Sequence, residues 1–192
     1  IVVTRWKDDL RLHLNNNLQF SSRDEYRYHE ALVHPGLATL PHARRVLILG
    51  GGDGLALREV LKYPQIEAVT LVDLDPAMTG LFSRAAALRK LNADSLSSPK
   101  VTVVNADALQ WLEENDTSFD FVVVDFPDPS NFAIGKLYSA SFYRLLEKHL
   151  NGGALAVIQS TSPLYARRSF WCVVNTIASV DLVATPYHAL VP

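Results

Sequence analysis

An apolar run that leads directly into a glycine cluster is the feature that most constrains the fold of this chain. Residues 46–54 read Val-Leu-Ile-Leu-Gly-Gly-Gly-Asp-Gly, and a helix-like segment follows over residues 55–63. In a doubly wound α/β domain, the first strand ends in such a turn and delivers a ligand to the N-terminus of the first helix. Glycines at Gly50, Gly52 and Gly54 would allow backbone and ligand to approach closely. Glycine clusters at strand ends also occur as simple tight turns, so neighbouring features must decide between the two interpretations.

The spacing of the glycines favours an adenosyl ligand that has no pyrophosphate. The dinucleotide fingerprint G-x-G-x-x-G requires glycine at position 55, where this chain has Leu55. Asp73 follows the cluster by about twenty residues, where an acidic residue accepts the hydroxyl hydrogens of a ribose. Asp107, farther along the chain, suits the exocyclic amine of an adenine. These features predict a nucleoside site of the adenosylmethionine-binding type.

Apolar runs of strand length alternate with helical patterns from Arg45 onward. Continuous apolar strands separated by helices predict a mainly parallel sheet that is covered on both faces. We therefore expect a doubly wound α/β fold of the class I adenosylmethionine-dependent methyltransferase type, with residues 23–192 as a Rossmann-like catalytic domain. Residues 151–153, Asn-Gly-Gly, are expected to end a helix. The predicted strands are 45–49, 68–73, 101–104, 119–125 and 153–159, with a sixth that begins near Asp181, and the predicted helices are 55–63, 76–91, 108–115 and 139–150.

Residues 1–22 predict a small, partial β-hairpin region that precedes this domain. Residues 10–14, Leu-Arg-Leu-His-Leu, alternate apolar and polar side chains as a half-buried strand does. Polar turn residues flank this run on both sides, and asparagine tolerates the left-handed conformation that such turns need. His13 lies on the polar side of the pattern, and we expect it to be solvated rather than to bind a ligand.

A capping box marks the start of the first predicted helix. Ser22 and Glu25 have the required spacing, which predicts a helix over residues 23–33. The helix should end near Pro35, because the residue before a proline disfavours helical dihedrals. Two tyrosines, a histidine and a glutamate crowd residues 26–30. Either the tyrosines pack while the polar groups face solvent, or the polar groups line a pocket wall.

Length, charge and cysteine usage narrow the classes of partner. A chain of 192 residues fits one domain with a small appendage. Its formal net charge of −2 and the lack of a basic run give no electrostatic basis for nucleic-acid binding. Cys172 is the single cysteine, which excludes a disulfide within the chain and fits a reducing compartment, so we expect a cytoplasmic domain. The chain starts and stops within strand-like patterns, which predicts a fragment that lacks its C-terminal strand.

Aspartates gather at the carboxyl ends of the predicted strands, where open parallel sheets bind their ligands. Residues 125–129, Asp-Phe-Pro-Asp-Pro, place two carboxylates on a loop that two prolines stiffen. Neighbouring carboxylates repel each other unless a cation joins them. No histidine or cysteine cluster accompanies them in the sequence, so we expect an organic cation rather than a metal. An aspartate at another strand end, such as Asp75 before Pro76, is equally well explained as a helix cap.

Asp53 adds a third negative charge from within the glycine cluster. The α-carboxylate of an ordinary adenosyl methyl donor would be repelled by this side chain. A donor that lacks the carboxylate and ends in an ammonium would be attracted to it. The predicted site would therefore select its donor by repulsion as well as by attraction.

Together these motifs resemble the spermidine synthases, also called polyamine aminopropyltransferases. The resemblance extends through nearly the whole chain. In residues 18–24 and 128–131 the chain is most similar to a longer bacterial form, in which a membrane-spanning region precedes this domain. The resemblance therefore implies a parent protein that is anchored in the cell membrane, and we expect a homo-oligomer. The residues that carry the resemblance are Gly50 to Gly54, Arg23-Asp24-Glu25, Tyr28-His29-Glu30, Asp125-x-x-Asp128-Pro129 and Leu137-Tyr138.

The resemblance implies a role for each candidate residue. The catalytic residue would be Asp125, as the proton acceptor. Neither a metal nor a permanently bound cofactor is implied. The residues that would contact amino groups of the substrate or donor are Tyr28, His29, Asp53, Asp128 and Gln159. The residues that would bind the nucleoside of the donor are Gly50, Gly52 and Gly54, with Asp73 at the ribose and Asp107 and Ala108 at the adenine.

Three features depart from the family pattern. The family has a glutamate where Asp73 stands, so the shorter side chain must reach further to the ribose. The family loop usually carries a proline near Phe132, so this chain departs from the family at the adenine contact there. A glutamine that the family uses at the donor site would lie upstream of Ile1, outside this chain.

The implied reaction is aminopropyl transfer, with decarboxylated S-adenosylmethionine as co-substrate. An amine of putrescine would take the aminopropyl group, giving spermidine and methylthioadenosine. Two alternatives remain. A class I methyltransferase shares the glycine cluster and Asp73, but its Asn/Asp-Pro-Pro-Tyr/Phe motif is not matched by residues 125–128. A non-catalytic polyamine- or nucleoside-binding domain would have no need of Asp125.

Overall fold

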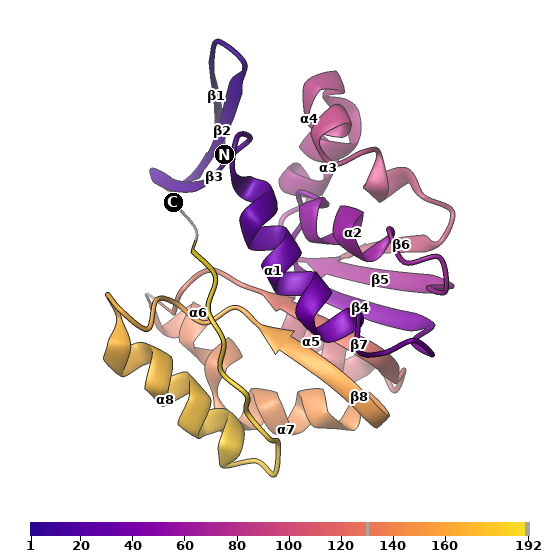
Figure 1. Cartoon of the computed structure of the whole chain (residues 1–192), viewed down its shortest axis with the longest axis vertical. Coiled ribbons are helices and arrows are strands. Elements are labelled where there is room, and N and C mark those ends of the chain that lie inside the picture. The colour runs from indigo at the N-terminus through magenta and orange to yellow at the C-terminus, as the bar shows by residue number, and fades with distance from the viewer. Residues whose placement is uncertain (130, 191–192) are drawn as a thin grey trace.

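The computed structural model describes residues 1–129 and 131–190, which contain two β-sheets (Figure 1). The smaller sheet is antiparallel and has the strand order β1-β2-β3. The larger sheet is parallel and has the order β6-β5-β4-β7-β8. The strands are β1 Val2–Trp6, β2 Asp9–Leu14, β3 Asn17–Ser21, β4 Arg45–Gly50, β5 Ala68–Asp73, β6 Val101–Asn105, β7 Phe119–Asp125 and β8 Leu150–Ile158.

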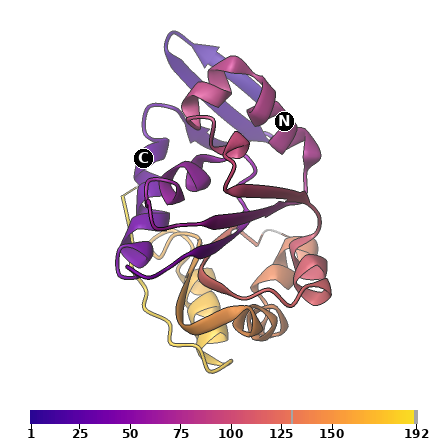
Figure 2. The same cartoon turned by 90° about the vertical axis from the view of Figure 1, so that its right-hand side faces the viewer.

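Helices pack against both faces of the parallel sheet, as the two perpendicular views show (Figures 1 and 2). Ile48 of β4 points into one buried cluster with residues of α1 and α2, whereas Leu47 and Leu49 point into a second cluster with residues of α5, α7 and α8. Burial on both faces explains why β4 is continuously apolar. The helices are α1 Glu25–Leu37, α2 Leu55–Val60, α3 Pro76–Arg84, α4 Ala86–Leu91, α5 Ala108–Glu114, α6 Phe132–Gly135, α7 Ala140–Lys148 and α8 Arg167–Ala178, with short 3₁₀ turns η1 Ser95–Ser97 and η2 Lys136–Tyr138.

The strand order confirms the predicted doubly wound fold. The chain enters the sheet at the central strand β4, adds β5 and β6 on one side, and then crosses to add β7 and β8 on the other. The direction of winding therefore reverses between β4 and β7. A crevice at such a switch point is where sheets of this type bind ligands. Gly50 and Asp125 are register partners at the carboxyl ends of these two strands.

The predicted bounds of β5 and β7 agree with the structure residue for residue, and β4 and β6 each extend one residue further than predicted. The single helix predicted over residues 76–91 is wrong in one respect. The backbone of Ala85 is extended, with φ −74° and ψ 117°, and it separates α3 from α4. Residues 151–153 do not end a helix, because β8 already begins at Leu150 and includes them.

The predicted capping box and helix end of α1 are also wrong. The hydroxyl of Ser22 accepts a hydrogen bond from the Leu10 backbone at 2.9 Å, and the helix begins after Asp24. The helix then continues through Pro35 to Leu37. A proline inside a helix leaves the carbonyl four residues earlier without its usual N–H donor. Here that carbonyl belongs to Ala31, and the hydroxyl of Tyr187 donates to it at 2.7 Å.

The C-terminal part of the chain differs most from the prediction. Residues 181–190 form no strand, so the sixth strand expected near Asp181 is absent from the described part of the chain. Instead the chain forms α8, a helix that was not predicted, which buries Phe170 and Val173. Val173 belongs to the cluster beneath α5 and α7. In the described residues, no helix combines the length and apolar character that a membrane span needs.

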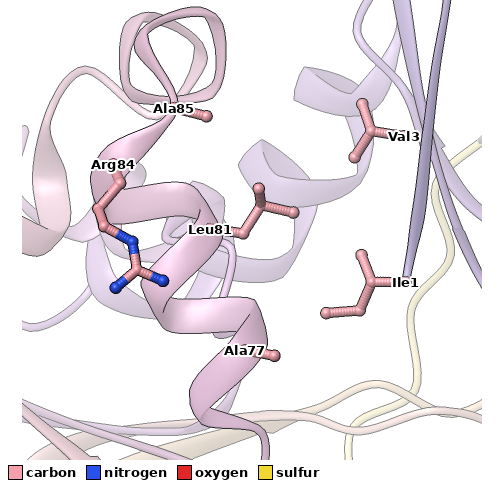
Figure 3. A pocket seen from close by; sticks show the side chains of 6 residues that line it. All are labelled: Ile1, Val3, Ala77, Leu81, Arg84 and Ala85. Carbon is pink, nitrogen blue, oxygen red and sulfur yellow. The ribbon is translucent and has the colours of Figure 1, made fainter.

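The N-terminal region is a three-stranded sheet rather than a hairpin alone. Its residues Leu12 and Phe20 share a buried cluster with Met78 and Phe82 of α3, which ties this sheet to the parallel domain. His13 is half-buried, and its Nδ1 atom is buried without a hydrogen-bond partner among the described residues, so the prediction of a solvated side chain is wrong. Between β1 and α3 lies an open groove (Figure 3), lined by Ile1, Val3, Ala77, Leu81, Arg84 and Ala85.

Candidate active site

The carboxyl ends of β4, β5 and β7 bring the predicted glycines together with two predicted carboxylates. Gly50 has a φ of +84°, a conformation that favours glycine. A Cβ atom at Gly50 would lie 2.2 Å from the carbonyl oxygen of Asp125, and one at Gly52 would lie 2.6 Å from the carboxyl carbon of Asp73. The glycines therefore allow the turn to approach the backbone of Asp125 and the carboxylate of Asp73. Gly54 has a φ of +75° and directly precedes α2.

Asp73 is held at the glycine turn by two backbone donors. Its Oδ2 accepts from the N–H of Gly52 and its Oδ1 from the N–H of Asp75, both at 2.9 Å. Burial raises the pKa of Asp73, and these two hydrogen bonds only partly oppose the effect. Because a carboxylate offers about four acceptor positions, the two oxygens can still accept the hydroxyls of a ribose. Asp75 caps α3 by accepting from the N–H of Ala77 at 2.8 Å, which confirms its interpretation as a helix cap.

Gly52→Ala is expected to weaken adenosyl binding with little change in stability. Gly52 has no positive φ, so the added Cβ strains mainly the Asp73 side chain, which must turn away from the Gly52 N–H. If Asp73 accepts the ribose hydroxyls as predicted, loss of the hydrogen bond that orients its carboxylate should lower the affinity for methylthioadenosine about tenfold. Titration calorimetry measures the affinity, and Gly152→Ala serves as the control because no described atom lies within 4 Å of a Cβ there. An unchanged affinity in Gly52→Ala would contradict the placement of Asp73 at the ribose.

Asp107 has two structural partners beside its predicted role at the adenine. It caps α5, with Oδ1 accepting from the N–H of Leu109 at 2.9 Å. Its Oδ2 pairs with Nζ of Lys136 at 2.8 Å. Burial alone would raise the pKa of Asp107, but these hydrogen bonds outweigh it and hold the pKa low. An adenine amine would share this carboxylate with Lys136, while the buried Ala108 follows at the first position of the helix.

Asp125, Tyr28 and Asp53 form the polar centre of the switch point. The hydroxyl of Tyr28 on α1 donates a hydrogen bond to Oδ1 of Asp125 at the end of β7. Burial raises the pKa of Asp125, and the charge of Asp53 raises it further, against the opposing effects of His29 and Tyr28. Burial likewise raises the pKa of Asp53, whose Oδ1 accepts from the N–H of Leu55 at 2.9 Å. Two carboxylates whose charged forms are disfavoured would be stabilised by a bound cation.

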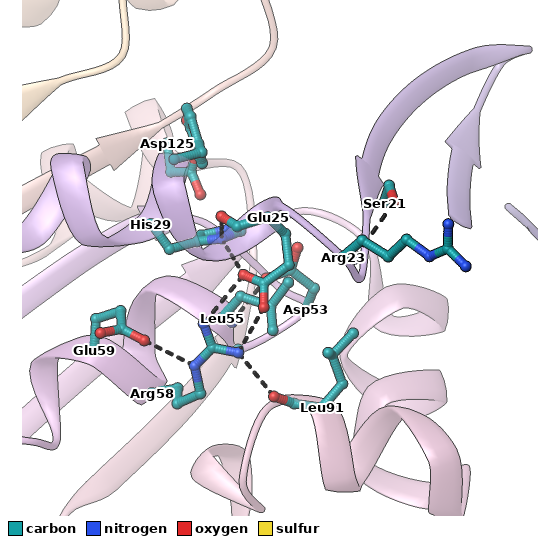
Figure 4. A network of polar contacts seen from close by, with 12 residues as sticks. Ser21, Arg23, Glu25, His29, Asp53, Leu55, Arg58, Glu59, Leu91 and Asp125 are labelled. Atoms are coloured by element: carbon teal, nitrogen blue, oxygen red, sulfur yellow. Dashed lines mark hydrogen bonds and ion pairs between the residues drawn. The ribbon is translucent and has the colours of Figure 1, made fainter. Parts of the chain in front are cut away.

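His29 lies beside these carboxylates, and Glu25 holds its ring in place (Figure 4). Its Nδ1 is 2.7 Å from Oε2 of Glu25, and both side chains are at most 4% exposed. Arg58 of α2 pairs with the same glutamate, with Nη1 2.8 Å from Oε1. Burial would lower the pKa of His29, but the hydrogen bond to Glu25 and the charges of Asp53 and Asp125 outweigh it and raise the pKa. Because His29 is buried and Tyr28 reaches Asp125, residues 28 and 29 line a polar site rather than a solvated helix face.

The second carboxylate of the proline-containing loop is hydrogen-bonded to the residue that follows β8, and that residue also contacts the buried Tyr138. Nε2 of Gln159 donates to Oδ1 of the exposed Asp128 at 3.0 Å. The hydroxyl of Tyr138 lies 3.1 Å from Oε1 of Gln159 and 3.2 Å from the carbonyl oxygens of Phe126 and Pro127. These contacts hold the side chains of Asp128 and Gln159 together, on the loop that begins with Asp125.

Sequence reasoning did not assign Glu25, Arg58 or Tyr138 to the site. The spacing of Glu25 and His29, four residues apart in a helix, was the one signal that could have paired them. No pattern in the sequence predicts Arg58 as a residue of the site, because its partner Glu25 lies on another helix.

One group of residues in the described part of the chain has the geometry to hold a metal ion, and it lies away from the aspartates. It consists of Glu30, His34 and Glu59. Glu59 is fully buried and already paired with Arg58 and Lys62, and His34 Nε2 contacts it at 2.9 Å. Arg58 and Lys62 therefore already provide the positive charge that would otherwise come from a metal ion. That the aspartate site takes no metal stays a prediction.

Comparisons with known proteins place the chain in a family. A family model described as the spermine/spermidine synthase domain matches residues 25–192. Over 192 residues the chain is 66% identical to polyamine aminopropyltransferase 2 of Ralstonia nicotianae and spans 38% of that protein. It is 58% identical over 192 residues to the polyamine aminopropyltransferase of Leptospira interrogans and spans 39% of it.

Solved structures share the fold. A spermidine synthase in complex with the transition-state analogue AdoDATO superposes with a TM-score of 0.83, at 24% identity, over 94% of this chain and 64% of that one. The spermidine synthase of Thermotoga maritima gives a TM-score of 0.81, also at 24% identity, over 94% and 63% of the two chains. The structural similarity confirms the predicted fold class, and the match over residues 25–192 shows that the chain belongs to the spermine/spermidine synthase family.

Proposed function

We propose that this chain carries the catalytic site of a polyamine aminopropyltransferase. The enzyme would move the aminopropyl group of decarboxylated S-adenosylmethionine to putrescine, giving spermidine and methylthioadenosine. The observation that carries the proposal is the convergence of Asp53 and Asp125 beside His29, at the switch point that also presents Asp73. Membership of the spermine/spermidine synthase family supports it.

The nucleoside half of the proposed site lies along the ends of β4, β5 and β6. The glycine turn would face the adenosyl group, Asp73 would accept the ribose hydroxyls, and Asp107 would accept the adenine amine. Lys136 keeps Asp107 charged and oriented. This half would serve any adenosyl donor, so it does not by itself distinguish aminopropyl from methyl transfer.

The amine half of the proposed site is what favours aminopropyl transfer. Asp53 and Asp125 are both half-buried and both have raised pKa values, so they gain most from a ligand that brings positive charge. A decarboxylated donor and a diamine are both cationic at neutral pH, since alkylamines have a pKa of about 10. Asp128, held by Gln159, would bind the far end of the diamine. The repulsion that Asp53 would exert on an α-carboxylate disfavours the ordinary methyl donor.

The reaction itself is a displacement at carbon. The lone pair of a primary amine forms a bond to the carbon attached to the sulfonium, and the C–S electron pair leaves with sulfur as neutral methylthioadenosine. The attacking nitrogen becomes positive and loses one proton. Asp125 would first orient the amine and then receive that proton, which becomes acidic as the C–N bond forms. The site must not over-stabilise the sulfonium, because its positive charge disappears in the reaction.

Binding of the two adenosyl donors separates this proposal from methyl transfer. We expect decarboxylated S-adenosylmethionine to bind at least about tenfold more tightly than the intact donor, measured by titration calorimetry on the full-length protein. Asp53→Asn removes the charge but keeps the oxygen that accepts from Leu55, so it should narrow this difference. Tighter binding of the intact donor would favour the methyltransferase alternative. A site that binds both donors but releases no methylthioadenosine would favour a non-catalytic binding domain.

We further propose that the full-length protein is a homo-oligomer that pairs through β1. Among the described residues, this strand forms an edge of the smaller sheet and exposes Val2 and Trp6 by 55% and 60%. An exposed apolar edge strand favours pairing with a second strand, and two identical edges can pair about a two-fold axis. A monomer in multi-angle light scattering of the full-length protein would overturn this assignment.

A further inference from the structure

The two ring nitrogens of His29 have different surroundings. Nδ1 lies 2.8 Å from the backbone carbonyl oxygen of Glu25 and 2.7 Å from its Oε2. A carbonyl oxygen only accepts, and an ionised carboxylate also only accepts. Nδ1 must therefore carry the hydrogen. Nε2 has no hydrogen-bond partner among the residues that the structure describes.

Arg58 keeps Glu25 ionised and immobile. Its Nη1 is 2.8 Å from Oε1 of Glu25 and its Nη2 is 3.1 Å from Oε2, so the pair is bidentate. The same guanidinium donates to the carbonyl of Leu91 and to Oε1 of Glu59, each at 2.8 Å. Burial would raise the pKa of Glu25, but the hydrogen bonds from His29 and Arg58 outweigh it and lower the pKa. Hydrogen bonds to three residues thus hold the Arg58 side chain in the orientation in which it binds Glu25.

We propose that Glu25, held by Arg58, is a positioning residue that fixes His29 in its Nδ1–H form and presents Nε2 as the acceptor for an N–H group of the amine substrate. The assignment of the amine rests on the proposed function. The negative charge of Glu25 alone would favour a second proton on Nε2 of His29. Arg58 offsets that charge, so Glu25 can hold the ring by its Nδ1–H while favouring the second proton less. His29 would then accept from the amine while Asp125 accepts its reacting proton.

The charged groups around His29 determine how amine binding should depend on pH. Glu25 lies on the same helix, and Tyr28 packs edge-on with ring centroids 4.9 Å apart. Asp53 faces the ring from the turn between β4 and α2, and Asp125 faces it from the end of β7. The carboxylates favour the protonated ring in the empty site. A bound ammonium neutralises them and favours loss of that proton. Because a protonated His29 repels the amine, amine affinity should fall as the pH drops through the raised pKa of His29.

The tautomer can be measured directly and without turnover. In long-range ¹H–¹⁵N spectra of the full-length protein labelled at histidine, with saturating putrescine, we expect His29 to show a protonated Nδ1 and an unprotonated Nε2. His29→Gln identifies the resonances. A ring protonated on Nε2 alone would overturn the proposal, and so would a doubly protonated ring at pH 8 with putrescine bound. The spectra report the protonation of His29 whether or not the protein transfers aminopropyl groups. A failure of this proposal can therefore be told apart from a failure of the proposed function.

Glu25→Gln tests the role of the charge. The variant keeps an oxygen that accepts from Nδ1 but removes the carboxylate, so the pKa of His29 should fall. The pH midpoint of the putrescine KM should then move to lower pH. Below the midpoint of the parent protein, KM should therefore be lowered, by about tenfold for each unit that the His29 pKa falls, with a smaller change in kcat. Glu67→Gln, whose side chain is 72% exposed, is the matched control. A lower kcat with an unmoved pH midpoint would indicate a merely structural role and would contradict the proposal.

Discussion

Asp125→Asn is expected to lower kcat/KM for aminopropyl transfer by about 10²- to 10⁴-fold, the usual contribution of a general base. The asparagine keeps an oxygen that can accept from Tyr28, so the geometry at the end of β7 should persist. It cannot receive the proton that the amine loses as the C–N bond forms. It also removes one of the two negative charges that attract the ammonium. The nucleoside half of the site does not include this side chain, so binding of methylthioadenosine should stay close to that of the parent protein.

Steady-state kinetics of the full-length protein with decarboxylated donor and putrescine provide the test. Asp116→Asn is the matched control, because Asp116 is an exposed carboxylate in the segment between α5 and β7. Near-normal turnover in Asp125→Asn would contradict the assignment of this residue. Loss of methylthioadenosine binding together with turnover would instead indicate that the substitution disturbed the glycine turn.

Arg58→Met is expected to lower the free energy of unfolding by about 3–5 kcal/mol, the loss typical of removing one partner from a buried ion pair. Arg58 is 14% exposed, and it pairs with Glu25 and Glu59, whose side chains are 3% and 0% exposed. Methionine fills a similar volume but leaves two buried carboxylates short of a cation. Lys62 and His34 still contact Glu59 in the variant. Most of the lost stability should therefore come from Glu25, which has no other arginine or lysine beside it among the described residues. Urea unfolding followed by tryptophan fluorescence measures the change.

The loss in Arg58→Met should depend on pH with a defined sign. The pKa of Glu25 is lowered in the folded protein. Its stabilising contribution is therefore present above the unfolded-state pKa of about 4.3 and is lost as the pH falls through the lowered pKa of the folded state. The difference between the two proteins should shrink in acid. The exposed Arg144 on α7 provides the control Arg144→Met, for which a change within about 0.5 kcal/mol is expected. An equally small change in Arg58→Met would show that the buried network is not stabilising.

The sequence was sufficient to predict the parallel sheet and the gathering of the aspartates. Strands β5 and β7 are buried apolar runs between polar ends, and that pattern depends only on local residues. Once the strands are parallel, their carboxyl ends must share one edge of the sheet, which places Asp73 and Asp125 around the glycine turn.

The features that could not be predicted depend on partners that are distant in the sequence. Helix α1 passes through Pro35, and Tyr187, far along the chain, donates to the carbonyl that the proline leaves free. Local proline rules cannot foresee such compensation. The ion pair between Asp107 and Lys136 and the contact of Arg58 with Glu25 likewise arise only when separate elements pack.

The most direct test of the central claim is product analysis by mass spectrometry of the full-length protein supplied with decarboxylated S-adenosylmethionine and a panel of diamines. The proposal predicts methylthioadenosine and an aminopropylated amine in equal amounts, with spermidine as the main product from putrescine. Formation of S-adenosylhomocysteine and a methylated product from the intact donor, with no methylthioadenosine from the decarboxylated one, would contradict it.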